Sequence, residues 1–214
     1  MPRTNEHILD FQGFASMTEL IRRKSLDLGC DDFPRNPYNF EELYGIDLAP
    51  LIIEGATYVQ ANLALEAIPF ENNFFDCVTA FDFIEHIPRQ LLSLDTGKSR
   101  LPFVELMNEI WRVLKPDGIF YAVTPAYPSG AAFQDPTHVN VISNETHTYF
   151  CGSSPYAGIY GFTGKFEKLR AEPVVLKTAL TAEKTTSKLL YNLQKRIFNP
   201  RRLSHFLWEL KAIK

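Results

Sequence analysis

Cysteine is scarce in this sequence, and its few cysteines lie far apart. The three residues, Cys30, Cys77 and Cys151, form no closely spaced pair. An odd number of cysteines in a chain without a secretion signal argues against a framework of disulfide bonds. Cysteine and histidine do not cluster at the spacing of a zinc site, so we expect no metal site.

Long hydrophobic runs are also missing. No stretch approaches the roughly 18 uninterrupted apolar residues that a membrane-spanning helix requires. The N-terminus carries early acidic residues and has no apolar core of the signal-peptide kind. We therefore expect a cytoplasmic protein.

Apolar residues make up 45% of the 214 residues, which is enough to build one core and excludes a disordered chain. We expect a single domain over residues 1–214. The charge is uneven, because residues 1–167 carry 11 basic and 22 acidic side chains whereas residues 168–214 carry 11 and 3. This asymmetry indicates either contact with an anionic partner or a solvated basic helix face.

The hydrophobic pattern alternates between strand-like and helix-like segments. It predicts strands at 25–28, 42–47, 57–61, 76–83 and 119–124, and helices at 6–24 and 103–114. Residues 166–176 and 204–213 alternate like two antiparallel strands, and between them lies a helical insertion at about 177–203, with its helix at 183–198. We therefore expect an α/β fold with a doubly wound, mostly parallel sheet and an antiparallel C-terminal edge strand.

Ligands bind such sheets at the carboxyl ends of the strands. The turn LDLGCDDF (26–33) follows the first strand, and Gly29 there lets the backbone approach a ligand closely. Asp47 ends the second strand, where a carboxylate can accept two hydrogen bonds from a ribose diol. The interval between them is near the roughly 20 residues of nucleoside-binding α/β units. An acid after a strand is also ordinary loop chemistry.

Three further segments resemble those of the small class I S-adenosylmethionine-dependent methyltransferases. IPFENNFFD (68–76) resembles their LPFxxxxFD segment, FIEHI (83–87) their motif after the fourth strand, and RVLKPDG (112–118) their RVLKPGG signature. With the first turn, the resemblance covers residues 25–124. It implies a Rossmann-like methyltransferase fold, S-adenosylmethionine as the cofactor, and methyl transfer as the activity.

The resemblance also implies the cofactor-binding residues. They are Asp27, Gly29 and Cys30 at the methionine end, Asp47 at the ribose, Asn62 and Leu63 near the adenine, and Phe83 near the sulfonium. Taken alone, Asp27 could merely cap the turn, and Cys30 fits a small turn residue better than a nucleophile. The family usually has glycines where this chain has Asp31 and Phe33. Aspartate tolerates a left-handed backbone, so the turn can still form, but the carboxylate would alter how the cofactor's own carboxylate is received.

His86, Asp135 and His138 are the candidate catalytic residues. His86 and Glu85 follow the fourth strand, although both also suit the start of a helix. Asp135 and His138 lie in the segment DPTHV, which resembles a segment of some bacterial methyltransferase-like proteins. A carboxylate can fix the tautomer of an imidazole that acts as a base. The alternative is a structural Asp-Pro turn capped by Thr137.

These observations predict methyl transfer to a small-molecule acceptor, with oxygen preferred because a histidine base is at hand. The alternative is a non-catalytic cofactor-binding or regulatory protein, because Asp31 and Phe33 depart from the family pattern. The sequence disfavours a dehydrogenase, since the first turn lacks GxGxxG, and nucleic-acid methylation, since no DPPY or NPPY segment follows the fourth strand.

The C-terminal insertion is basic. Its positive residues are Lys184, Lys188, Lys195, Arg196, Arg201 and Arg202. They either face solvent or attract an anionic or lipid-linked acceptor, or the membrane surface itself.

Overall fold

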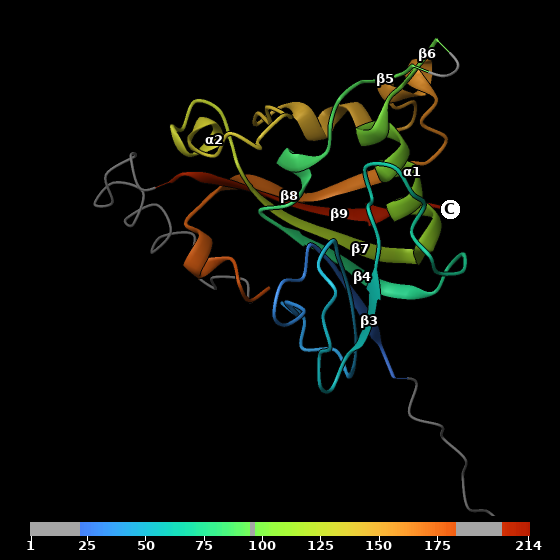
Figure 1. Cartoon of the computed structure of the whole chain (residues 1–214), viewed down its shortest axis with the longest axis vertical. Coiled ribbons are helices and arrows are strands. Elements are labelled where there is room, and N and C mark those ends of the chain that lie inside the picture. The colour runs from blue at the N-terminus through green and yellow to red at the C-terminus, as the bar shows by residue number, and fades with distance from the viewer. Residues whose placement is uncertain (1–21, 95–96, 183–202) are drawn as a thin grey trace, which may run out of the picture.

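The structure, a computed structural model, describes residues 22–94, 97–182 and 203–214. A seven-stranded sheet in the order β3-β2-β1-β4-β7-β9-β8 forms its centre (Figure 1). The strands are β1 (Lys24–Leu28), β2 (Glu42–Asp47), β3 (Thr57–Gln60), β4 (Phe75–Phe81), β7 (Leu114–Pro125), β8 (Phe166–Val174) and β9 (His205–Ala212).

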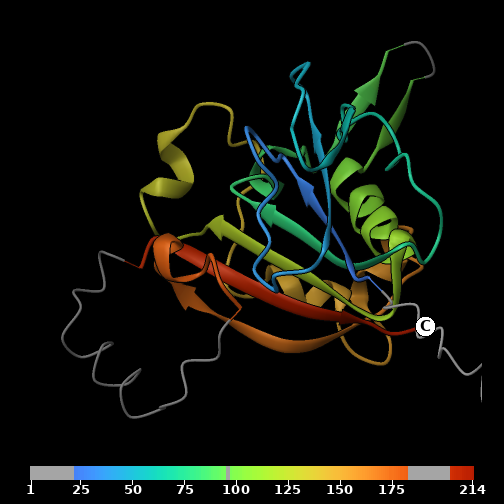
Figure 2. The same ribbon diagram turned by 90° about the horizontal axis from the view of Figure 1, so that it is seen from below.

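Neighbouring strands from β3 to β7 pair in parallel, whereas β9 pairs antiparallel with both β7 and β8. This confirms the predicted mostly parallel α/β sheet with an antiparallel C-terminal strand. Figure 2 shows β8 in orange beside β9 in red along one margin of the sheet. The C-terminal strand β9 lies one position in from the edge, between β7 and β8.

The strand boundaries follow the hydrophobic pattern closely. β2 has the predicted bounds, and the central strand β4 is buried along almost its whole length, as its continuous apolar sequence predicts. The pattern placed the end of β4 at residue 83, but the strand ends at Phe81 because Asp82 has a left-handed backbone with φ of 48°. The helix predicted to reach residue 24 does not, because Lys24 begins β1.

Several predicted features lie outside the described residues. They are residues 6–21 of the first predicted helix, the helix at 183–198 with most of the predicted insertion, and the basic residues from Lys184 to Arg202. Of the predicted insertion, the structure describes residues 177–182, the first two of which belong to the short 3-10 turn η4 (Leu176–Thr178).

One face of the sheet is covered by α1 (Pro102–Val113), the helix that the pattern placed at 103–114. Its buried side is formed by Phe103, Leu106, Met107 and Ile110 and packs in one cluster with residues of β1, β4 and β7. The 3-10 turns η2 (Thr146–Phe150) and η3 (Tyr156–Tyr160) lie on the same face (Figure 1). After α1 the chain bulges at residues 115–118, where Asp117 has φ of 61°, before Ile119 pairs with Cys77 of β4.

The other face is covered, within the described ranges, by loop residues. Tyr38, Phe40, Leu176 and Ala179 pack there against Cys77, Phe81, Tyr121, Val123 and Leu207. Tyr38 donates a hydrogen bond of 2.7 Å from its hydroxyl to Glu209 of β9, which ties the loop after β1 to the far strands.

The remaining elements lie in the segments that connect the strands along the chain. They are the 3-10 turn η1 (Ile84–His86), the hairpin of β5 (Leu91–Ser93) and β6 (Lys98–Arg100), which the pattern did not predict, and α2 (Ala131–Gln134). No helix among the described residues is long and apolar enough to cross a membrane.

Candidate functional site

The turn after β1 is shaped by Gly29, whose φ is +70°. A Cβ atom at this position would lie 2.6 Å from Cδ2 of Phe83, so the ring of Phe83 occupies the space that a side chain would need. The close approach expected between this glycine and a ligand is therefore made by Phe83, which is half-buried beside it. Glycine is required here both by the backbone conformation and by that contact.

Asp31 has a left-handed backbone with φ of 50°, the conformation that aspartate tolerates better than most residues. Its N–H donates to Oδ2 of Asp47 at 3.1 Å. Oδ1 of Asp47 accepts from the N–H groups of Leu48 and Ala49 at 2.7 and 3.2 Å. Since a carboxylate oxygen accepts about two hydrogen bonds, Oδ2 keeps room for one further donor.

Asp27 is fully buried and bonds to the protein. Thr79 donates from its hydroxyl to Oδ1 at 2.6 Å, and the N–H of Arg35 donates to Oδ2 at 2.8 Å. The Arg35 guanidinium lies 3.6 Å from the same carboxylate and donates to the carbonyl of Gly29 at 3.0 Å. Burial raises the pKa of Asp27 to about 6, outweighing the contacts with Thr79 and Arg35. In this structure Asp27 is buried and stabilises the turn through Thr79 and Arg35.

Two more predicted cofactor-binding residues are buried. Cys30 packs against Gly45, and its burial, together with the nearby Asp27 and Asp47, raises the pKa of the thiol to about 12, which disfavours the thiolate that a nucleophile needs. Leu63 belongs to the main hydrophobic core.

Asn62 lies at the same edge of the sheet as Asp47. The N–H of Ala61, next to it, donates to the carbonyl of Asp47 at 3.0 Å. Oδ1 of Asn62 accepts from the N–H of Ala64 at 3.1 Å, so the side chain caps the following turn. Gly29, Asp47, Asn62 and Phe83 therefore come together at the carboxyl ends of β1, β2, β3 and β4.

A second group of polar residues follows β4. Glu85, in η1, is almost completely buried, and burial raises the pKa of its carboxyl to about 7. Oε2 accepts a hydrogen bond of 2.8 Å from the hydroxyl of Thr124 in β7. Oε1 is buried without a hydrogen-bond partner among the described residues.

His138 faces this carboxyl group. Its Nε2 lies 4.0 Å from Oε1 of Glu85, and its Nδ1 lies 3.3 Å from the carbonyl of Ala132. Because a carbonyl only accepts hydrogen bonds, Nδ1 carries the proton and the Nε2 lone pair faces Glu85. The ring of His86 lies beside it, with 4.8 Å between the centroids.

Asp135 orients His86 rather than His138. The hydroxyl of Thr137 donates to Oδ1 of Asp135 at 2.6 Å and lies 3.0 Å from Nδ1 of His86, which must then be the donor. The N–H of Thr137 also donates to Oδ1, which makes the capped Asp-Pro turn that was the alternative interpretation. Asp135 was predicted to pair with the ring of His138. The structure instead links Asp135 to His86 through Thr137 and places Glu85 beside the ring of His138.

Backbone hydrogen bonds fix this loop against η1. The carbonyl of Glu85 accepts from the N–H groups of Val139 and Asn140 at 3.0 and 2.9 Å. The side chain of Asn140 donates to the carbonyl of Ile84 at 3.2 Å and accepts from Arg89 at 2.6 Å. His138, one residue before this anchor, is thereby held next to Glu85.

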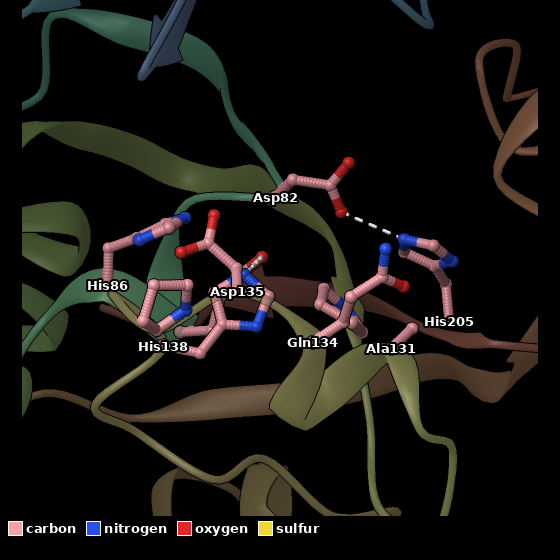
Figure 3. Close-up of a pocket in the computed structure, with 10 residues that line it drawn as sticks. Asp82, His86, Ala131, Gln134, Asp135, His138 and His205 are labelled. Carbon is pink, nitrogen blue, oxygen red and sulfur yellow. Dashed lines mark ion pairs between the residues drawn. The ribbon is translucent and has the colours of Figure 1, made fainter.

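These groups line a cavity of about 540 Å³, a size that suits a small molecule. It is lined by Asp82, Glu85, His86, Pro125, Ala131, Gln134, Asp135, Pro136, His138 and His205. Figure 3 shows His86, Asp135 and His138 on one side and His205 on the other, where it forms an ion pair of 2.9 Å with Asp82. Sequence reasoning missed Asp82 and His205. Asp82 fell inside the strand predicted at 76–83 and so gave no signal of its own, and His205 enters from a distant segment.

Comparisons with known proteins identify the fold. Residues 26–122 match the model of a family described as a methyltransferase domain. A chain from the complex of the Haloferax volcanii Trm112 methyltransferase activator with a protein described as a methyltransferase has 13% identity and a TM-score of 0.52, covering 90% of this chain and 84% of that one. The [4+2]-cyclase SpnF has 15% identity and a TM-score of 0.51, covering 90% and 75%. At these identities the likeness concerns the fold alone. A comparison with curated proteins found no match.

Proposed function

We propose that the chain is a class I S-adenosylmethionine-dependent methyltransferase, because residues 26–122 match a methyltransferase-domain model, and that it methylates a small-molecule acceptor, preferentially on oxygen. The observation that carries the proposal is the cavity of about 540 Å³ beyond the carboxyl ends of β4 and β7. His86 projects into it from η1, which follows β4, and His138 projects into it from the loop after β7. Such a position is where an α/β sheet binds its ligands.

The residues at the first turn fit the cofactor, S-adenosylmethionine. Oδ2 of Asp47 has capacity for one hydroxyl of a ribose, and Phe83 offers a half-buried ring beside Gly29. Asp27, Cys30 and Leu63 support this edge from the core. When bound, the cofactor supplies an electrophilic methyl group, so the protein has mainly to align the acceptor and exclude water.

The acceptor's hydroxyl would lie at the end of the cavity near Nε2 of His138. Nε2 of His138 would accept the proton of that hydroxyl as its oxygen takes the methyl group that the bound cofactor would supply. The bond from Nδ1 to the carbonyl of Ala132 fixes the orientation of the His138 ring, with Glu85 beside Nε2. An anionic or lipid-linked acceptor remains a prediction that depends on the basic residues between Lys184 and Arg202.

A second candidate is a protein that binds the cofactor without turnover. Three backbone donors already occupy the carboxylate of Asp47, and Asp31 stands where the family usually has glycine. The neighbour SpnF, described as a cyclase, is an example of this fold with a different chemistry, and fold alone does not determine activity.

A methyl-transfer screen tests the proposal. The purified protein is incubated with methyl-labelled S-adenosylmethionine and a set of hydroxyl compounds, with matched amines as the comparison. Label appearing in hydroxyl compounds supports O-methylation. Label confined to amines contradicts the oxygen preference, and cofactor binding without transfer to any acceptor supports the second candidate.

A further inference from the structure

Three side chains of metal-ligand type that line the cavity lie close together. One ligand atom each from Glu85, His86 and His138 lie within 4.8 Å of one another. Ligand atoms bound to one ion at about 2.0–2.2 Å are roughly 3–4 Å apart, so shifts of about an ångström would let the three share an ion.

The buried carboxyl of Glu85 gives an independent reason to expect a cation. Its side chain is 1% exposed, and Oε1 has no partner in the described part of the chain, whereas Oε2 is fixed by Thr124. A buried oxygen without a partner is costly, and native proteins rarely leave one unsatisfied. A positive ion next to Oε1 would remove this cost.

The two histidines are held as metal-binding histidines usually are. Each uses Nδ1 for an outer hydrogen bond, His138 to the carbonyl of Ala132 and His86 to Thr137, which in turn bonds to Asp135. Outer bonds of this kind fix the tautomer and ring orientation of metal ligands. They leave the Nε2 lone pair of both rings for an ion.

We propose that Glu85, His86 and His138 bind one divalent first-row transition-metal ion of the zinc type, with an open coordination position facing the cavity. Two imidazoles and one carboxylate are a common ligand set of catalytic zinc, which keeps its remaining position for water or substrate. The expectation of no metal site considered only cysteines and histidines close in sequence, whereas His138 reaches the other two ligands through the fold.

The catalytic consequence rests on the proposed function, although metal binding itself does not. A hydroxyl oxygen bound to the ion gives up its proton more readily, so a hydroxyl acceptor would be activated by the ion. In the metal-loaded protein His138 is then a ligand, and the proton passes to solvent instead of to its ring. The oxygen still bonds to the methyl carbon as the carbon–sulfur bond breaks.

Titration of the metal-free protein tests the site without cofactor or acceptor. Protein dialysed against a chelator is titrated with Zn²⁺ by calorimetry and with Co²⁺ by visible absorption, which reports nitrogen and oxygen coordination. We expect one ion per chain, and affinity lowered about a hundredfold or more in His86→Ala and in His138→Ala. Glu85→Gln keeps the shape of the side chain and should also weaken binding, and circular dichroism verifies that each variant folds.

His205→Ala is the matched control, because His205 lines the same cavity but pairs with Asp82 outside the group of three. Its affinity for Zn²⁺ should equal that of the wild type. A folded wild-type protein that binds neither ion, or Zn²⁺ binding that survives all three substitutions, overturns the inference and leaves the proposed methyl transfer standing. One ion bound through these residues supports the site even if no acceptor is ever methylated, so the two proposals fail separately.

Discussion

Asp31 donates its backbone N–H to the carboxylate of Asp47 at 3.1 Å. Of the two residues that depart from the family's glycine pattern, Asp31 is therefore the one that supports the acid expected to bind the ribose. Its side chain and its backbone N–H have separate effects, because a substitution removes the carboxylate and keeps the N–H.

Asp31→Gly should tighten binding of S-adenosylhomocysteine severalfold. The change removes a carboxylate from the region expected to receive the cofactor's own carboxylate, and it keeps the N–H that bonds to Asp47. The free energy of unfolding should change by less than about 1 kcal/mol, because relief of the left-handed backbone opposes the added chain entropy.

Asp32→Gly is the control for this measurement, since Asp32 is an exposed neighbour of equal charge. Equal tightening in both variants would assign the effect to net charge. Weaker binding in Asp31→Gly alone would mean that its carboxylate makes a favourable contact with the cofactor.

Asp27 predicts a pH dependence of stability. Its pKa is about 6 in the folded protein against the usual 3.8, so well below pH 3.8 the carboxyl is protonated in both states and costs nothing. As the pH rises to about 6, the unfolded chain ionises first and the folded state loses stability. Above pH 6 the cost is complete, a few kcal/mol at about 1.4 kcal/mol per pKa unit.

Denaturant unfolding of the wild type and Asp27→Asn between pH 4 and 8 measures this cost. The difference in unfolding free energy should shift toward the variant as the pH rises and then level off. A difference that is constant over the range, or that shifts toward the wild type, would show that burial does not raise this pKa.

His138→Ala should lower methyl transfer about a hundredfold or more while cofactor affinity stays within about twofold. Asp135→Asn should cost less, about tenfold or below, because its contact runs through Thr137 to His86. Single-turnover rates and calorimetry on both variants check this. Losses of folding stability that parallel the losses of activity would indicate a purely structural loop.

The basic C-terminal segment predicts a salt-dependent interaction. Sedimentation with anionic liposomes at low and high salt should show binding that high salt abolishes, since charges are screened within roughly 10 Å at 0.1 M salt. Changing Lys184, Lys188 and Lys195 together to Glu should abolish it as well. Absence of binding at low salt would leave only the solvated-face interpretation.

The strands could be predicted because each is a short apolar run with its own turn residues. Both predicted ends of β2 match the structure. The predicted end of β4 lies two residues too far along the chain, because the left-handed backbone of Asp82 ends the strand. Gly29 and Asp47 could be predicted for the same reason, since their roles follow from local position at strand ends.

Contacts between distant segments could not be predicted. Thr124 meets Glu85 only because β7 pairs with β4, and His205 enters the cavity only because β9 pairs with β7. Asp135 was assigned to His138 because they are close in sequence, whereas the fold connects it to His86 through Thr137. The cluster around Glu85 therefore became visible only in three dimensions.

The most direct test of the account is calorimetric titration of S-adenosylhomocysteine into the wild type, Asp47→Ala and a control, Asp76→Ala. Asp76 pairs with Lys115 near the amino end of β4, away from the proposed cofactor edge. The account predicts binding to the wild type and to the control with equal affinity. In Asp47→Ala, loss of a charge-assisted hydrogen bond of about 1.5–3 kcal/mol should weaken binding about ten- to a hundredfold. No binding to the wild type, or equal binding to all three proteins, would contradict it.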